Sequence, residues 1–131
     1  MEPATKRFRK RDAILNCLRS TTVHPDADWV YEHVKAEIPD ISLATVYRNL
    51  ALFKEQGLII SVGNVDGVER FDGNPAPHVH FICNSCGRIV DLHNISVPEE
   101  LNNAAALASG GQVSSCQLTF TGLCGECTKI N

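Results

Sequence analysis

The sequence predicts an α+β fold in two parts. Three segments with helical periodicity come first, a hairpin pattern follows them, and a second set of strands lies beyond a proline-rich stretch. That stretch, Asn-Pro-Ala-Pro at residues 74–77, suits neither the continuation of a strand nor the start of a helix, so we place a hinge there. With 131 residues, 44% of them hydrophobic, the chain has room for two small domains, which we expect at residues 1–73 and 78–131.

The first part contains three predicted helices, each with one apolar side. The first helix covers residues 5–19, and its apolar side consists of Phe8, Ile14, Leu15 and Leu18. The second helix follows Pro25, has Asp26 as its N-cap, and buries Ala27, Val30, Tyr31 and Val34. The third helix has Ser42 as its N-cap, ends before Gly57, and buries a stripe made of Leu43, Val46, Leu50 and Phe53.

Two short strands are predicted after the third helix, at residues 58–62 and 68–71. The dipeptide Asp66-Gly67 between them is typical of a tight hairpin turn. Three helices followed by a hairpin is the element order of a winged helix, which is a DNA-binding fold. The charge distribution agrees with this interpretation: the net charge is -3, yet five of the twelve Lys and Arg residues lie within residues 6–11.

The second part is predicted to be a small α/β unit. Residues 78–83 and 87–93 form two strands joined by a turn that contains cysteines. A capping box at residues 96–99 then opens an alanine-rich helix, which ends at about Ser109 before two glycines. Residues 112–124 form a third strand that leads into the last pair of cysteines.

The strongest chemical signal is a pair of Cys-x-x-Cys motifs separated by thirty-seven residues. Each pair supplies two thiolates, and four thiolates together close a tetrahedral shell with no open position. Such a shell predicts structural Zn(II). A redox-active dithiol is the alternative interpretation. The predicted ligands are Cys83, Cys86, Cys124 and Cys127.

A second group of candidate ligands lies on the other side of the same strands. If the cysteine turn makes an antiparallel hairpin that pairs Ile82 with Ile89, His80 lies opposite Asp91 and His78 lies opposite His93. Two imidazoles and a carboxylate then converge away from the sulfurs. Nitrogen and oxygen ligands suit Fe(II), Mn(II) or Zn(II). Two solvated histidines on an exposed strand are the alternative.

These motifs resemble the ferric uptake regulator family of dimeric, metal-dependent transcription factors. The resemblance covers nearly the whole chain, through "ATVYRNL", "ERFDG", "HVHFICNSCGRIVDLH" and "GLCGEC". Within the family the chain is most similar to the peroxide-stress regulators. The resemblance implies a homodimer that binds double-stranded operator DNA as a repressor, with a structural Zn(II) ion and a regulatory Fe(II) or Mn(II) ion.

The resemblance also implies roles for individual residues. It assigns the regulatory ion to His24, Asp72, His78, His80 and Asp91. Iron-sensing members usually carry Glu at the position of Asp72, and zinc-sensing members commonly a Cys, so Asp72 favours peroxide sensing through oxidation of His24 or His78. An iron- or manganese-responsive repressor without peroxide sensing is the alternative. On the third helix, the outward-facing candidates for DNA contact are Thr45, Tyr47, Arg48 and Asn49, of which the resemblance favours Tyr47 and Arg48.

Two other classes of function compete with a regulator. Two histidines and a carboxylate also form the facial triad of non-haem iron oxygenases, but the chain has no evident substrate domain, so we do not expect an enzyme. A zinc-stabilised interaction module with incidental histidines is the second competitor. The sequence contains no apolar run long enough to cross a membrane and no secretory signal, so we expect a cytoplasmic protein.

Overall fold

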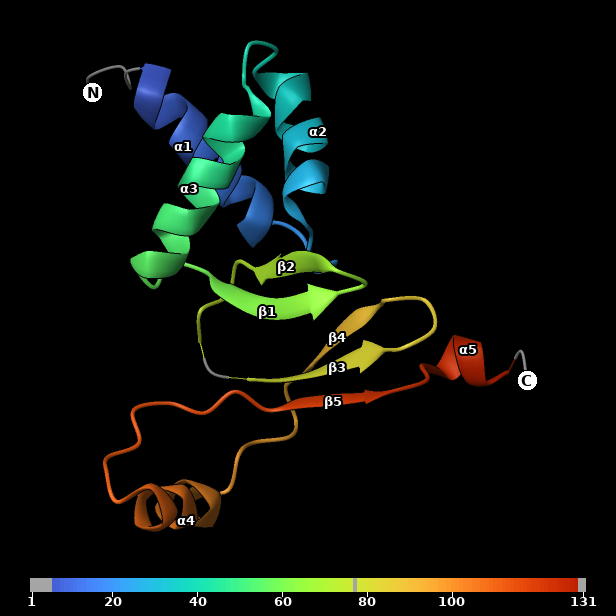
Figure 1. Cartoon of the computed structure of the whole chain (residues 1–131). Coiled ribbons are helices and arrows are strands. Elements are labelled where there is room, and N and C mark those ends of the chain that lie inside the picture. The colour runs from blue at the N-terminus through green and yellow to red at the C-terminus, as the bar shows by residue number, and fades with distance from the viewer. Residues whose placement is uncertain (1–5, 77, 130–131) are drawn as a thin grey trace. The chain divides into compact units, whose positions relative to one another are not determined.

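A computed structural model describes residues 6–76 and 78–129 of the chain (Figure 1). The chain divides into two compact units, residues 1–75 and 76–131. Thr5 and Pro77, which belong to the predicted first helix and hinge, lie outside the described residues. The hinge therefore stays a prediction.

The first unit begins with three helices that share one core. They are α1 (Lys6–Arg19), α2 (Ala27–Glu37) and α3 (Leu43–Glu55). Both predicted N-caps are confirmed: the Asp26 side chain accepts a hydrogen bond from the backbone N–H of Trp29, and Ser42 accepts one from Thr45. The largest side chains fully buried in this core are Ile14, Leu18, Val30, Ile38, Val46, Leu50, Phe53 and Ile59.

A two-stranded hairpin completes this unit and confirms the winged-helix order. It consists of β1 (Ile60–Val65) and β2 (Val68–Asp72) (Figure 1). It turns at Asp66 and Gly67, whose φ angles of 54° and 81° are those of a tight hairpin turn. The pairing register shifts between Ser61 and Gly63, which is a β-bulge. At the far end of β2, Phe71 enters the helical core.

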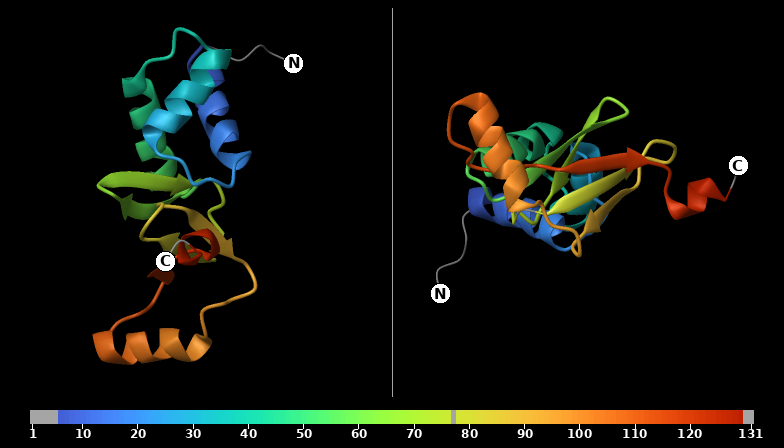
Figure 2. Two further views of the ribbon diagram at one scale, coloured as in Figure 1. Left: turned by 90° about the vertical axis from the view of Figure 1, so that its right-hand side faces the viewer. Right: turned by 90° about the horizontal axis from the view of Figure 1, so that it is seen from below.

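The second unit is built on a three-stranded sheet. Its strands are β3 (Val79–Cys83), β4 (Ile89–Leu92) and β5 (Thr119–Gly122), in the order β4-β3-β5 (Figure 2). The predicted register is confirmed, because Ile82 pairs with Ile89 and His80 pairs with Asp91. β5 is parallel to β3 and reaches it after α4 (Glu99–Ser109), while α5 (Gly125–Thr128) carries the last cysteine.

The helix α4 stands away from the sheet of its own unit (Figures 1 and 2). None of its residues, 99–109, is buried. Leu101 and Leu107 are 46% and 85% exposed, so this helix presents apolar surface that its own unit leaves uncovered. Gly110 ends the helix in the left-handed conformation, as predicted.

Four predictions about local structure are wrong. Phe8, which was predicted to lie on the apolar side of the first helix, is 54% exposed. Leu43 is 37% exposed, because it is the first residue of α3 and the buried stripe begins one turn later at Val46. The capping box fails because Pro98 is the N-cap of α4, without a side-chain hydrogen bond, so Glu99 is the first helical residue rather than the third. The third strand is shorter than expected, since residues 112–118 have no regular structure.

Within residues 6–76 and 78–129, none of the helices combines the length and the apolar character that a membrane span requires.

Candidate metal centres

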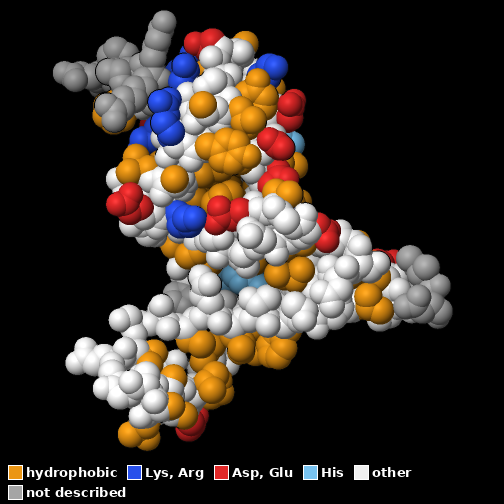
Figure 3. All heavy atoms as spheres, in the orientation of Figure 1, with side chains coloured by type: hydrophobic (Ala, Val, Ile, Leu, Met, Phe, Trp, Pro, Cys, Tyr) orange, Lys and Arg blue, Asp and Glu red, His pale blue; other side chains and the backbone are white. Residues whose placement is uncertain are grey.

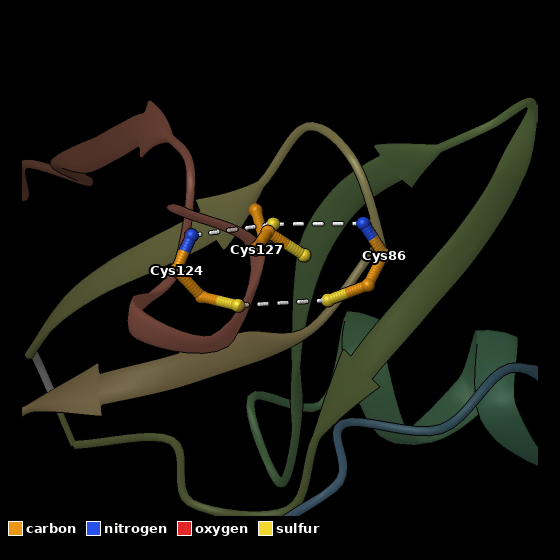
Figure 4. Close-up of side chains that lie close together, drawn as sticks. Cys86, Cys124 and Cys127 are labelled. Carbon is orange, nitrogen blue, oxygen red and sulfur yellow. Dashed lines mark hydrogen bonds between the residues drawn. The ribbon is translucent and has the colours of Figure 1, made fainter. Parts of the chain in front are cut away.

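The four predicted zinc ligands come together in the second unit. Cys83 ends β3, Cys86 lies in the following turn, Cys124 is the N-cap of α5, and Cys127 lies within that helix. Their sulfur atoms all lie within 4.8 Å of one another, and the sulfurs of Cys86 and Cys124 are 3.9 Å apart. Figure 4 shows Cys86, Cys124 and Cys127 turned toward a common point. This is the geometry of a closed four-sulfur site.

Backbone hydrogen bonds prepare this cluster for a cation. The Cys83 sulfur accepts N–H groups from Cys86 and Cys124, at 3.5 and 3.3 Å, and these bonds lower the pKa of Cys83 to about 6. A hydrogen bond with Ser85 lowers the pKa of Cys127, but its hydrogen bonds with the sulfurs of Cys124 and Cys83 outweigh it and raise that pKa to about 12. The backbone N–H groups thus favour the thiolate form of Cys83, which is the form that binds a metal ion.

The second candidate site in this unit is a trio of His78, His80 and Asp91. The Nε2 atoms of the two histidines lie 2.9 and 3.1 Å from the same oxygen, Oδ1 of Asp91. Two atoms that bind one ion at right angles, with bonds of about 2.1 Å, lie about 3.0 Å apart. Each nitrogen is thus spaced from this oxygen as two ligands of one ion are. Both histidine side chains are 6% exposed, so they are not solvated surface histidines.

Hydrogen bonding prepares His78 for this role. Its Nδ1 lies 2.7 Å from the carbonyl oxygen of Ala76, which can only accept, so Nδ1 carries a proton and donates it. In the neutral ring Nε2 is then the atom with the free lone pair, as a metal ligand requires. His93 contributes less: its Nε2 is 3.8 Å from Asp91, and its side chain is 68% exposed.

The first unit holds a separate pair, His24 and Asp72. Nε2 of His24 lies 3.3 Å from Oδ2 of Asp72, and both side chains are buried. The other carboxylate oxygen of Asp72 accepts the backbone N–H of Asn74 at 2.9 Å, which fixes the orientation of the carboxylate. The next residue, Gly73, packs directly on the last turn of α1: a Cβ atom there would lie 2.6 Å from the carbonyl oxygen of Leu18.

Sequence reasoning did not single out Arg70, which supports this pair. Its Nε donates to the carbonyl oxygen of His24, and its terminal nitrogen donates to that of Val23 at 2.7 Å. A single arginine on a strand has no sequence pattern that would reveal such contacts. The nearest available signal is its position two residues before Asp72.

The helix predicted to contact DNA, α3, exposes the two favoured residues. Tyr47 is 54% exposed, and Arg48 is exposed as well. Thr45 and Asn49 are half-buried and hydrogen-bonded within the helix, since the Thr45 hydroxyl accepts from Arg48 at 3.2 Å and the Thr45 carbonyl accepts from Asn49 at 2.9 Å. Arg48 also lines a groove of about 1040 Å³.

That groove runs between α1 and α3 and contains two further cations, Lys10 and Arg11. Figure 3 shows Lys and Arg side chains beside hydrophobic ones over the helices of this unit. A groove that combines cations with amide and hydroxyl groups suits a phosphate backbone.

Comparison with known proteins relates the whole chain to one family. A model of the ferric uptake regulator family matches residues 3–121. The peroxide operon regulator of Bacillus subtilis is 40% identical over 92% of this chain and 82% of its own length. The peroxide-responsive repressor PerR of Staphylococcus epidermidis is 36% identical over 92% of this chain and 79% of its own length.

Solved structures agree with the sequence comparison. The peroxide stress regulator of Campylobacter jejuni superposes with a TM-score of 0.81 at 31% identity, covering 93% of this chain and 91% of that chain. The ferric uptake regulator of Vibrio cholerae superposes with a TM-score of 0.70 at 25% identity, covering 93% and 92%.

Proposed function

Since this chain belongs to the ferric uptake regulator family, and is therefore a metal-dependent DNA-binding repressor and not an enzyme, we propose that its regulatory ion reports hydrogen peroxide. The observation that carries this proposal is the pairing of His24 with an aspartate, Asp72, at 3.3 Å. The resemblance associates a glutamate at that position with iron sensing, and an aspartate with peroxide sensing. The names of the most similar relatives point in the same direction.

A single ion bound by ligands from both units is the second part of the proposal. The pair of His24 and Asp72 offers two ligand atoms, and the trio of His78, His80 and Asp91 offers three. Neither set alone supplies the five or six nitrogen and oxygen ligands that Fe(II) or Mn(II) binds. Five ligands together would come close.

Such an ion would couple metal binding to DNA binding. It would fasten the winged helix to the second unit in one pose, and in a dimer that pose determines the separation of the two α3 helices. Half-sites on DNA lie about one helical turn, roughly 34 Å, apart, so only some poses can bind. To change such a pose from rare to dominant, the ion must bind it more tightly than the other poses by about 5.5 kcal/mol.

The peroxide response would use the same ligands. Fe(II) bound there would lend the electron that cleaves the O–O bond of hydrogen peroxide and would recover it from the imidazole that is oxidised, so the iron undergoes no net oxidation. His24 and His78 hold imidazole carbons next to that reaction. Oxidation of one such carbon takes one oxygen atom from peroxide, releases water, and yields 2-oxo-histidine. The altered ring is a poorer ligand, so the regulatory ion would be lost and the repressor would leave its DNA.

The four-sulfur cluster we assign to structural Zn(II). A closed shell of four thiolates leaves no position for a substrate, and its contribution to folding would be on the order of 10 kcal/mol. It would stabilise a unit whose sheet has only three strands and whose helix α4 is uncovered. We assign the dimer contact to this same unit, because Leu101 and Leu107 expose apolar surface.

The contact with operator DNA we assign to α3. Arg48 is long enough to bind a guanine edge or a phosphate, and Tyr47 can contact a thymine methyl group or a phosphate. The Thr45 hydroxyl accepts a hydrogen bond from the Arg48 side chain, and the Asn49 side chain donates one to the helix backbone. Both residues contribute to the surface that would face the major groove.

The experiment that tests peroxide sensing compares the Fe(II), Mn(II) and Zn(II) forms after brief exposure to peroxide. Peptide mass spectrometry of the Fe(II) form should find a gain of about 16 Da, one oxygen atom, on His24 or His78, together with loss of DNA binding. Mn(II) and Zn(II) forms should keep unmodified histidines and bound DNA. His33, an exposed histidine stacked on Trp29 in α2, is the internal control and should stay unmodified in all three forms.

Two results would contradict the proposal. Unmodified histidines with retained DNA binding would make the protein a sensor of iron or manganese level. Unmodified histidines with lost DNA binding would make a thiol the sensor.

A further inference from the structure

We propose that Arg70 is a positioning residue for the regulatory metal: it holds the backbone of His24 in the one conformation that aims the imidazole at Asp72. The inference rests on the proposed function, because it concerns the same ion. It adds a residue that binds no metal and yet determines how well the metal is bound.

His24 has a backbone conformation that a residue with a side chain adopts only occasionally without supporting contacts. Its φ angle is +53°, in the left-handed region, which is uncommon for residues other than glycine and costs free energy when a side chain is present. Such a residue persists only where surrounding contacts hold it. The contacts that hold His24 are therefore part of the metal site.

Arg70 makes contacts of this kind on both sides of His24. The carbonyl oxygen of Val23 belongs to the peptide unit before the His24 Cα atom, and the carbonyl oxygen of His24 belongs to the peptide unit after it. The Arg70 guanidinium donates to both. Because φ and ψ describe the rotation of these two peptide units about one Cα atom, a rigid planar group that binds both of them fixes both angles.

The rest of β2 continues this attachment. The backbone N–H of Phe71 donates to the carbonyl oxygen of Pro25 at 2.9 Å, one residue beyond His24. Asp72 then faces the His24 ring through Oδ2. The strand thus places one ligand directly and holds the other through Arg70, so the two ligands move together.

The test compares Arg70→Ala with wild-type protein that retains its four-sulfur metal. Removal of a group that orients a metal ligand typically weakens binding 10- to 100-fold, so we expect a loss of roughly that size in Mn(II) affinity. Zinc content should not change. In the absence of the regulatory ion, the Phe71 amide should exchange its hydrogen faster in the variant, because the loop that it binds is no longer held.

Two further variants separate positioning from general stabilisation. Arg70→Lys keeps the charge and can reach one carbonyl but lacks the planar fork, so its Mn(II) affinity should lie between those of wild type and Arg70→Ala. Glu69→Gln is the matched control: it removes the charge of the adjacent residue, whose carboxylate is paired with Lys54 at 3.0 Å. Its Mn(II) affinity should equal that of wild type.

The outcomes distinguish this inference from the proposed function. Equal Mn(II) affinity in wild type and Arg70→Ala would overturn the role of Arg70 alone. A lower melting temperature in Arg70→Ala with unchanged Mn(II) affinity and unchanged exchange at Phe71 would reduce Arg70 to a stabilising residue. Wild-type protein that bound neither Mn(II) nor Fe(II) besides its zinc would overturn the proposed function, and the inference with it.

Discussion

Replacing Gly73 by alanine should destabilise the winged helix through one steric contact. The added Cβ atom would lie 2.6 Å from the Leu18 carbonyl oxygen and 2.8 Å from the Arg19 nitrogen. Ordinary contact begins at 3.4 Å, so the backbone of α1 or of the residues after β2 must move by about 0.8 Å. Neither atom belongs to a flexible side chain that could turn away.

The expected magnitude follows from the cost of overpacking a well-packed site, about 1–3 kcal/mol. In a unit of about 75 residues each kcal/mol lowers the melting temperature by roughly 4–8 °C, so we expect a decrease of roughly 5–20 °C. Fluorescence of Trp29, the single tryptophan of the chain, reports this transition because Trp29 packs against the core of the first unit. The Mn(II) affinity should fall as well, since Asp72 precedes Gly73 and must move with it.

Gly111→Ala is the matched control for this substitution. A Cβ atom there would lie 3.7 Å from the Ser109 hydroxyl, which is ordinary contact, so the transition should not shift. A Gly73→Ala protein that melted within about 2 °C of wild type would refute the reasoning, because a backbone contact of 2.6 Å cannot be relieved without cost.

Three further predictions concern the other sites. Cys124→Ser should abolish zinc binding and unfold the second unit, at a cost on the order of 10 kcal/mol, whereas Cys116→Ser should retain zinc. Elemental analysis measures the zinc content of both variants, and circular dichroism measures their folding. A folded, zinc-free Cys124→Ser protein would exclude a structural ion. Arg48→Ala should weaken operator binding by roughly 1–3 kcal/mol, measured in a mobility-shift titration, and should leave the dimer intact. If the variant bound the operator as tightly as wild type, α3 would not be part of the DNA interface. Burial, and next to it the charge of Glu37, raise the pKa of Cys17 above its ordinary range, so alkylation by iodoacetamide should be slow at neutral pH and speed up as the pH is raised. Rapid modification of folded protein at neutral pH would contradict this.

The elements that the sequence predicted well are those determined by local signals. The register of β3 and β4 follows from the alternation of side chains and from the cysteine turn, so Ile82 and Ile89 could be paired before the structure was known. Asp26 and Ser42 are N-caps because their side chains bond to backbone groups three residues away. The clustering of the four cysteines likewise follows from two short motifs and a shared preference for one ion.

The features that the sequence did not reveal depend on contacts between distant segments. Arg70 reaches a loop 46 residues earlier in the chain, and Gly73 is needed because it approaches the last turn of α1. Neither residue has a periodicity or a spacing that points to its partner. The parallel alignment of β5 beside β3 is also non-local, and it follows a connection that contains α4.

The position of β3 between the two sites of the second unit has a consequence for biosynthesis. Cys83 at the end of this strand belongs to the four-sulfur cluster, and His80, three residues earlier, belongs to the trio with Asp91. The turn that brings β4 back to β3 also carries Cys86, so an ion bound by the four sulfurs would hold the strand pairing that sets the spacing of the trio. We therefore expect a newly made chain to bind the ion of the four-sulfur cluster before it binds the ion of the trio. A cell short of the first metal would accumulate protein that cannot respond to the second, however abundant that second metal is.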